Sequence, residues 1–481
     1  MKIIDPRVWV LSAACAALTA CVAPPPQPED MTLGIPDQLP VLSTQAESEA
    51  SQLNPSEHWQ QFFSDPHLQA LITKALEFNS DLKVATARVA EARAMYGIQD
   101  SERFPQLGAQ GEGQRGRVPA DLSLTRQAVT SGQYQVGLGV SAFELDFWGR
   151  VRNLSDAALA NYLATEQARR AFEISLIALA ADAYLQALEL SERVELARKT
   201  VATRTESQRI MAQRVRIGSS SELELRSVDS LLLAARSELA NLEREKAQNA
   251  ALIQQLTGHT GPVADANTLL AEQRFDEVVP ADMPSTVLLQ RPDLRAAEQQ
   301  LVAARANVEA ARAAFFPRIT LTGVAGTASS ALDGLFRGGS GAWSFMPQIS
   351  LPIFDGGARE SNLALAEARK HMAVANYEST IRTAFKEVAD ALAAQHWLAE
   401  QEKEQTALVA SEQDRARLAN LRYEQGSAAY LEVLDAQRSQ FSAEQMLLQL
   451  QRVRLANTVA LYRALGGGSA ANSTASNTVT N

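Results

Sequence analysis

The sequence contains very little cysteine and histidine. Of its 481 residues only two are cysteines, Cys15 and Cys21, and both lie close to the N-terminus. The rest of the chain can therefore form neither a disulfide nor a thiolate metal site. The five histidines are scattered without metal-ligand spacing, and neither a nucleophile elbow nor a phosphate-binding loop is present. We therefore expect no enzymatic activity, no cofactor and no metal.

Long apolar runs and excess positive charge are also lacking. No run of about 18 apolar residues, the length typical of a membrane helix, follows the N-terminus, so no membrane-spanning helix is expected. The net charge of −10 argues against a general nucleic-acid-binding protein. With 21% charged and 46% hydrophobic residues, the composition is that of a folded chain.

The N-terminus has the order of an export signal. Two basic residues precede an apolar run from Val8 to Ala20, which is too short to remain as a membrane span. The run ends in Leu-Thr-Ala-Cys, which resembles the cleavage box of bacterial lipoproteins. We expect residues 1–20 to be a signal peptide and Cys21 to carry the acyl chains, which anchor stably when there are several. The alternative is an ordinary signal peptide with an unrelated cysteine. Residues 21–57 are then a Pro-rich tether and an extended segment.

Two runs of alternating residues flank a turn-rich segment at about residues 317–355, a pattern that predicts a β-hairpin. Each run is roughly 9–11 residues, enough to cross a bilayer as a tilted strand. One face could then meet lipid and the other water. The residues that share the apolar face are Ile319, Leu321, Gly323, Trp343, Phe345, Ile349 and Leu351.

The same pattern recurs at about residues 105–147, which indicates a duplication. The Phe-Pro pair at Phe104 is repeated at Phe316, 212 residues later. After the hairpins the matching positions are 208 residues apart, as for Gly218 and Gly426. The difference falls inside the hairpin, where loops vary in length. Each half of the chain therefore carries two strands among its helices.

Each half also predicts a long helical hairpin. No proline lies between Arg150 and Pro262, and the only break is at Gly218. A helix from about Arg150 to Ile217 would be on the order of 100 Å long. The returning helix, from Ser221 to Thr257, has the alternating three- and four-residue apolar spacing of a coiled coil.

Polar residues interrupt the apolar seam of the returning helix at the same level in both halves. They are Lys246 and Asn249 in the first half and Arg454 and Asn457 in the second. We interpret this level as a wet stretch that faces a channel.

The elements divide the chain into two repeats, residues 58–257 and 293–466, with hairpin tips near Gly218 and Gly426. Residues 258–292 form a linker, and residues 467–481 are a tail expected to be disordered. Four strands cannot close a barrel, whereas twelve strands from three chains leave a lumen. The expected fold is mainly α with a membrane β-barrel: a trimeric tunnel of a 12-stranded β-barrel and a 12-helix α-barrel.

The chain resembles the TolC-like outer-membrane factor family, in its lipoprotein branch that serves resistance-nodulation-division efflux pumps (the NodT-type efflux lipoproteins). The matching segments are Trp59–Leu68, Phe104-Pro105, Asp146–Arg152, Arg291–Leu294, Phe316-Pro317, Leu351–Gly357 and Leu431–Arg438. The resemblance implies a homotrimeric duct in the outer membrane with a long periplasmic extension. It also implies two partners, a periplasmic adaptor and an inner-membrane transporter. The expected function is passive exit of drugs or other small solutes.

The resemblance assigns a periplasmic gate to Leu431, Asp435 and Arg438. Three copies of Asp435 around a threefold axis repel one another, and Arg438, on the same helix face, would offset that repulsion. The alternative is an exposed ion pair of little energetic value. The first repeat has Leu223, Ser227 and Ser230 at the matching positions, so the two hairpins would be unequal.

Two further sets of residues have expected roles. By the resemblance, the hairpin tips at Gly218, Ser219, Gly426 and Ser427 would meet the adaptor; the alternative is a turn requirement alone. Trp148, Trp343 and Phe345 are expected either at the membrane interface or packed between strands and helices.

Two other functions remain open. The same fold could serve as the outer-membrane duct of a type I protein secretion system, because the inner-membrane partner selects the cargo. An anchored coiled-coil periplasmic scaffold is disfavoured, because the chain has two helical hairpins and two strand pairs.

Overall fold

A computed structural model describes residues 59–123, 126–258, 268–275 and 285–467. The predicted signal peptide, Cys21, the tether and nearly all of the predicted tail lie outside the described residues.

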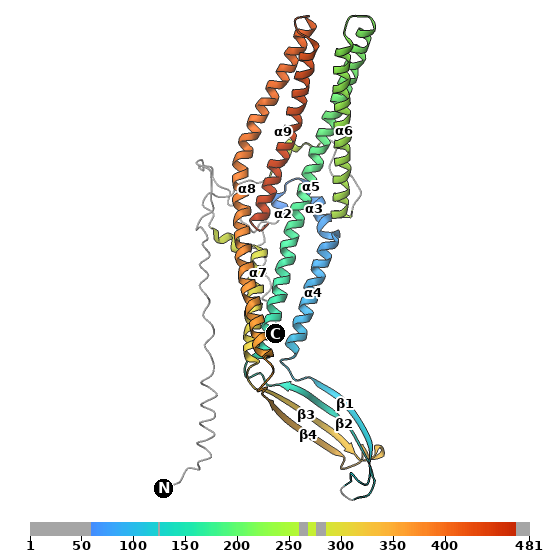
Figure 1. The fold of residues 1–481 in the computed structure, drawn as a ribbon, viewed down its shortest axis with the longest axis vertical. Coiled ribbons are helices and arrows are strands. Elements are labelled where there is room, and N and C mark those ends of the chain that lie inside the picture. The colour runs from blue at the N-terminus through green and yellow to red at the C-terminus, as the bar shows by residue number, and fades with distance from the viewer. Residues whose placement is uncertain (1–58, 124–125, 259–267, 276–284, 468–481) are drawn as a thin grey trace, which may run out of the picture. The chain divides into compact units, whose positions relative to one another are not determined.

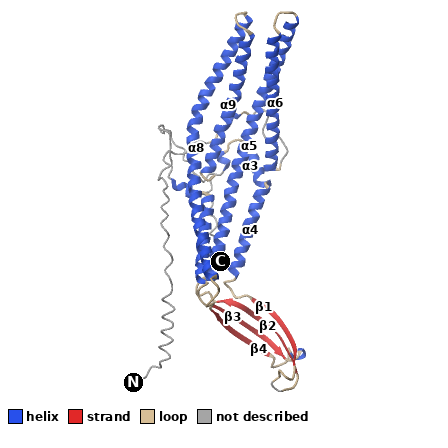
Figure 2. Ribbon diagram, in the orientation of Figure 1, coloured by secondary structure: helices blue, strands red, loops and turns tan. Residues whose placement is uncertain are grey.

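Two similar series of elements follow one another along the chain (Figures 1 and 2). The first series is α2 (Trp59–Phe62), α3 (Pro66–Phe78), α4 (Ser80–Ser101), β1 (Leu107–Val118), β2 (Val129–Glu144), α5 (Arg150–Arg216) and α6 (Glu222–Thr257). The second series is α7 (Pro292–Ala313), β3 (Arg318–Ser329), β4 (Gly341–Ser350), α8 (Ala358–Glu424) and α9 (Tyr430–Ala464). Short 3-10 turns lie at Leu270–Glu272, Ser285–Gln290 and Leu332–Gly334.

The two long helices α5 and α8 have 67 residues each, or about 100 Å at the usual rise. Each begins after a glycine with positive φ, Gly149 at 76° and Gly357 at 87°. A carboxylate then accepts a hydrogen bond from a backbone N–H of the first helical turn. In α5, Asp146 accepts from the N–H of Arg152 at 2.7 Å. The predicted unbroken helix after Arg150 is confirmed.

Helix α5 is the element against which most others pack, since it contacts α3, α4, α6, α7 and α9. Among the described residues, only α5 has a stretch long and apolar enough to pass for a membrane span, with a mean hydropathy of 1.4. However, 56% of that stretch is buried. Its apolar character therefore fits a core helix.

The start of α3 is tied to α5 through Asp65. This residue caps the N-terminus of α3, because its Oδ1 accepts from the N–H of His67 at 2.8 Å. Its Oδ2 accepts from the Tyr184 hydroxyl at 2.6 Å and from Gln273 at 2.8 Å. Burial opposes ionisation here, but these hydrogen bonds outweigh it and hold the pKa of Asp65 below its usual value. The aromatic residues packed nearby are Phe62, Phe63, Phe275 and Tyr462.

The four strands form one antiparallel sheet in the order β1-β2-β3-β4. Directly opposed residues share a face, and the register places Ile319 opposite Ile349 and Ala325 opposite Trp343. On the other face Thr320 lies opposite Gln348. The two predicted hairpins and their apolar and polar faces are confirmed.

Strands β2 and β3, which come from different halves of the chain, approach closely through glycine. Gly137 lies directly opposite Gly326. A Cβ added at Gly326 would lie 2.1 Å from the Val136 carbonyl oxygen, and one at Gly137 would lie 2.7 Å from the Ala325 carbonyl oxygen. Because both obstacles are backbone atoms, side chains are excluded at these two positions of the β2–β3 junction.

The interpretation of a wet stretch on α6 and α9 is wrong for its two asparagines. Asn249 is only 5% exposed, and its side-chain amide donates to the Ala183 carbonyl at 2.9 Å. Asn457 donates in the same way to the Ala391 carbonyl, also at 2.9 Å. Each asparagine thus joins the two helices of its own hairpin. A polar residue at a seam position can face either water or a buried carbonyl, and sequence spacing does not distinguish these.

Gly326→Ala is predicted to destabilise the folded protein, because the added methyl group must displace the backbone of β2. Overpacking of this kind costs about 1–3 kcal/mol. Gly323→Ala is the matched control on the same strand, because a Cβ there meets only ordinary contacts at 3.7 Å and beyond. Thermal unfolding in detergent should show a clear loss for Gly326→Ala and little for Gly323→Ala. Equal stability of the two variants would contradict the close approach.

Candidate functional site

The two helical hairpins end in nearly identical turns. At the first tip Gly218 has φ 75°, its N–H donates to the Val215 carbonyl at 3.0 Å, and the N–H of Ser219 donates to Arg214 at 2.9 Å. At the second tip Gly426 has φ 74°, and the N–H of Ser427 donates to Arg422 at 2.9 Å. This is the Schellman arrangement, in which glycine takes the left-handed conformation.

The space around both tip glycines is open. A Cβ added at Gly218 or Gly426 would meet nothing within 4 Å, so only the positive φ requires glycine within the single chain. Ile217 beside the first tip is 71% exposed. The tips therefore present a compact surface from which polar hydroxyls and one large apolar side chain are accessible.

Asp435 on α9 is the centre of a charged group near the second tip. The side chain of Arg438 donates to its Oδ1 at 2.5 Å, as the sequence spacing predicts. Arg415 on α8 donates to its Oδ2, also at 2.5 Å. The hydrogen bond to Asp435, followed by the contact with Glu412, raises the pKa of Arg415. Through Arg415 this carboxylate joins the two helices of the hairpin, whereas Arg438 lies on the same helix as Asp435.

Sequence reasoning missed Arg415 because it lies on the other helix. A signal was available, however. Helices α8 and α9 run antiparallel from the turn at Gly426, so residues at similar distances before and after that turn lie side by side. Arg415 lies eleven residues before Gly426 and Asp435 nine residues after it.

A groove of about 790 Å³ separates the tip regions of α6 and α9. Leu431, Asp435 and Arg438 line it from α9. Ser227 and Ser230, which match Asp435 and Arg438 in the first repeat, line it from α6. The structure therefore brings the three predicted gate residues and the two serines to one groove. Leu431 is 65% exposed there.

The three aromatic residues expected at a membrane interface have different environments. Trp148 stacks on Phe316 with ring centroids 4.7 Å apart, and its indole N–H donates to the Pro317 carbonyl at 2.9 Å. It fits the packing alternative, because it joins the start of α5 to the start of β3. Trp343 and Phe345 on β4 are 80% and 62% exposed. These two remain candidates for contact with lipid.

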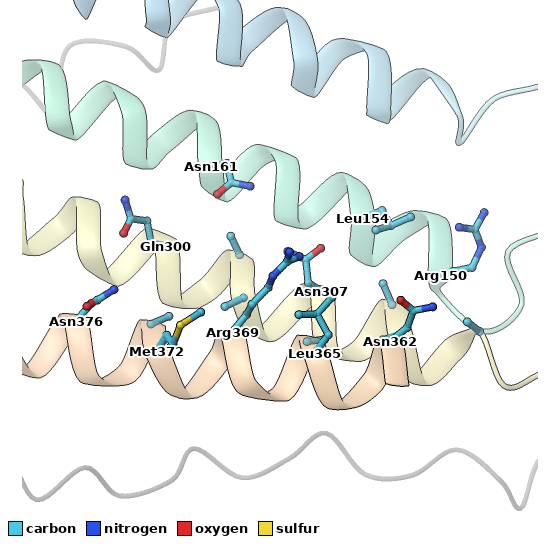
Figure 3. A pocket seen from close by; sticks show the side chains of 17 residues that line it. Arg150, Leu154, Asn161, Gln300, Asn307, Asn362, Leu365, Arg369, Met372 and Asn376 are labelled. Carbon is cyan, nitrogen blue, oxygen red and sulfur yellow. The ribbon is translucent and has the colours of Figure 1, made fainter. Parts of the chain in front are cut away.

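A second groove, of about 580 Å³, lies among α5, α7 and α8 next to the sheet. Figure 3 shows that amide side chains and Arg369 gather there. The amides are Asn161, Gln300, Asn307, Asn362 and Asn376. None of the lining residues is a histidine, cysteine, serine or carboxylate. The groove therefore offers hydrogen bonds and positive charge, but neither a nucleophile nor a carboxylate or imidazole for acid–base chemistry.

Comparison with known proteins places this arrangement among membrane channels. The model of the outer membrane efflux protein family matches two segments, residues 71–259 and 283–467. The chain is 47% identical over 409 residues to the solvent efflux pump outer membrane protein SrpC of Pseudomonas putida, covering 85% of this chain and 87% of that protein. It is 40% identical over 453 residues to the cation efflux system protein CusC of Escherichia coli K12, covering 94% and 97%.

Solved structures agree with these sequence matches. A membrane protein from Pseudomonas aeruginosa has a TM-score of 0.85 and 40% identity, over 92% of this chain and 99% of that one. The open state of the outer membrane channel MtrE of Neisseria gonorrhoeae has a TM-score of 0.81 and 37% identity, over 92% and 98%.

Proposed function

The chain belongs to the outer membrane efflux protein family, and from that premise we propose that three copies form one continuous duct through the outer membrane and into the periplasm. Each copy contributes four strands to a 12-stranded barrel and four helical segments to a 12-helix barrel, numbers that follow from the observed elements and threefold symmetry. The duct performs no chemistry, and solutes pass along it without being altered. Lipid attached to Cys21 anchors each copy.

The two-faced sheet is the observation that carries this proposal. Strands β1 to β4 have 12, 16, 12 and 10 residues, and about 9–11 residues cross a bilayer as a tilted strand. The apolar face, with Trp343 and Phe345 exposed on it, suits lipid. The face with Gln110, Gln135 and Gln348 suits a water-filled lumen.

The names of the relatives support a proposal for the cargo. These are named for solvent, toluene and cation efflux, so we propose small solutes as cargo. A periplasmic adaptor joins the hairpin tips at Gly218 and Gly426, and an inner-membrane resistance-nodulation-division transporter supplies the solute. Secretion of proteins by a type I system would need the same duct with another transporter, and the names of these relatives favour efflux.

The charged group at Asp435 is proposed as the gate. In a threefold assembly three Asp435 side chains lie around the axis, and in each copy Arg415 and Arg438 hold the carboxylate and offset the repulsion. Leu431 adds an apolar constriction beside it. Such ion pairs are partly exposed and individually weak, so a docked partner can break them.

Single-channel conductance in planar bilayers tests the gate. Asp435→Ala and Arg415→Ala should each raise the open probability or conductance, because each removes a link between α8 and α9. Because exposed ion pairs are individually weak, each substitution should shift the open-to-closed ratio by only a few-fold. Asp414→Ala is the matched control, because Asp414 lies on α8 and pairs only locally with Arg417. Equal conductance for all four proteins would remove Asp435 and Arg415 from the gate.

Substitution at Gly218 tests the docking of an adaptor. Gly218→Ala and Gly218→Trp impose similar positive-φ strain, about 1–2 kcal/mol, but only tryptophan adds bulk to the open tip. We expect Gly218→Trp to abolish capture of the adaptor and Gly218→Ala to retain most of it, with both trimers intact. Loss of adaptor binding and of the trimer together in the tryptophan variant would refute a separate docking role.

A further inference from the structure

We propose that Arg244 on α6 of one copy binds Asp390 and packs against Trp397 on α8 of the neighbouring copy. This contact would seal the helical barrel between chains. The inference rests on the threefold assembly proposed above and adds the residues that form its interface.

A contact within one chain provides the template for this interface. The two helical hairpins meet through α5 and α9. At this contact Arg452 on α9 lies 3.2 Å from Asp182 and 2.7 Å from Glu189, both on α5. Glu189 is buried, and it also pairs with Arg193 at 2.9 Å. A charged network therefore holds the first hairpin to the second.

The two hairpins repeat each other in detail at this level. Asn249 donates to the Ala183 carbonyl and Asn457 to the Ala391 carbonyl, both at 2.9 Å. Asn457 follows Asn249 by 208 residues, and Ala391 follows Ala183 by the same number. Ala183 directly follows Asp182, and Ala391 directly follows Asp390. Asp390 therefore occupies the place on α8 that Asp182 occupies on α5.

A ring of three chains contains six such hairpins in alternation. Going round the ring, a boundary within a chain alternates with a boundary between chains. Consider a rotation about the ring axis that moves the first hairpin onto the second, and the second onto the first hairpin of the next chain. It moves α5 onto α8 and α9 onto α6 of the next chain, so the α5–α9 contact becomes a contact between α8 and that α6. It carries Arg452 onto Arg244 and Asp182 onto Asp390, so both residue types of the ion pair are retained.

In the single chain these residues are exposed and bonded only along their own helices among the described contacts. Asp390 is 62% exposed and binds Lys386 one turn away at 2.5 Å. Arg244 is 55% exposed and binds Asn241 at 2.6 Å and Gln248 at 2.8 Å. The side chains of Asp390 and Arg244 could therefore rotate to contact a neighbouring chain without breaking a buried contact.

Trp397 supplies the second half of the site. It occupies the position that matches Glu189, and it is 64% exposed, so its ring is accessible to a second chain. An arginine placed as Arg452 is placed would lie over its ring and make a cation–π contact. At the interface between chains, the contact of arginine with Trp397 therefore replaces the buried ion pair of Arg452 with Glu189. A large aromatic surface of this kind is typical of contacts between separate molecules.

Cross-linking of paired cysteines tests the interface in the full-length protein. The double variant Arg244→Cys with Asp390→Cys, treated with a short bismaleimide, should yield covalently joined chains of two and three copies on a denaturing gel. The matched control is Asp182→Cys with Arg452→Cys, which should cross-link within one chain and keep the mass of one chain. Each single variant should give no joined chains.

The mass of each variant in detergent separates the possible failures. A trimer whose Arg244 and Asp390 cysteines do not join chains would overturn this interface and leave the duct intact. A wild-type protein that is not trimeric would overturn both. A charge exchange gives an independent readout: Arg244→Asp should lower the dissociation temperature of the trimer, and adding Asp390→Arg should restore it. Failure of the exchange to restore it would also contradict the ion pair.

Discussion

The unpaired edges of the four-stranded sheet constrain everything else in this protein. Strands β1 and β4 each have a neighbour on one side only, so each carries a row of backbone N–H and C=O groups without a partner in the sheet. In a bilayer such groups have no water to bind, and only closed barrels or helices are stable there. One chain cannot close its own sheet, because four strands are too few. Association with further copies is therefore part of folding into the membrane.

The helices of one chain also need further copies of the chain to form a closed barrel. Internal duplication gives each chain two hairpins of matched length, and α5 holds them together through the buried network around Arg193 and Glu189. The remaining lateral surfaces, on α6 and α8, expose charged residues and Trp397. The edges of the sheet and the lateral faces of α6 and α8 can therefore pair with the same partner, which is a second copy related by rotation about one axis. Because the two hairpins of each chain are similar in structure, six hairpins from three chains can surround a lumen.

Departures from the repeat are as informative as its preservation. Asn249 and Asn457 make the same hydrogen bond in both hairpins, as expected for a contact on which packing depends. Near the tips the repeat diverges. The three members of the charged group, Arg415, Asp435 and Arg438, are matched in the first hairpin by Ser207, Ser227 and Ser230. This charged group therefore occurs in one hairpin per chain, which gives a gate threefold rather than sixfold symmetry.

Much of this architecture is readable from the sequence, because it depends on local signals. Proline-free runs predict α5, alternation predicts the strands, and glycine before serine predicts the tips. Contacts between distant elements were not readable in the same way. Arg415 was missed as a partner of Asp435, Asn249 was misread as wet, and Trp148 was not assigned to Phe316. Each of these depends on which face of a helix meets a neighbour, and periodicity alone does not identify that neighbour.

Native mass spectrometry of the detergent-extracted protein tests the central claim most directly, because closure of the sheet depends on the number of chains. We expect a single dominant species of three chains that loses its fold when it dissociates. A folded species of one or two chains, stable after extraction from the outer membrane, would contradict it, because its sheet could not close into the proposed 12-stranded barrel.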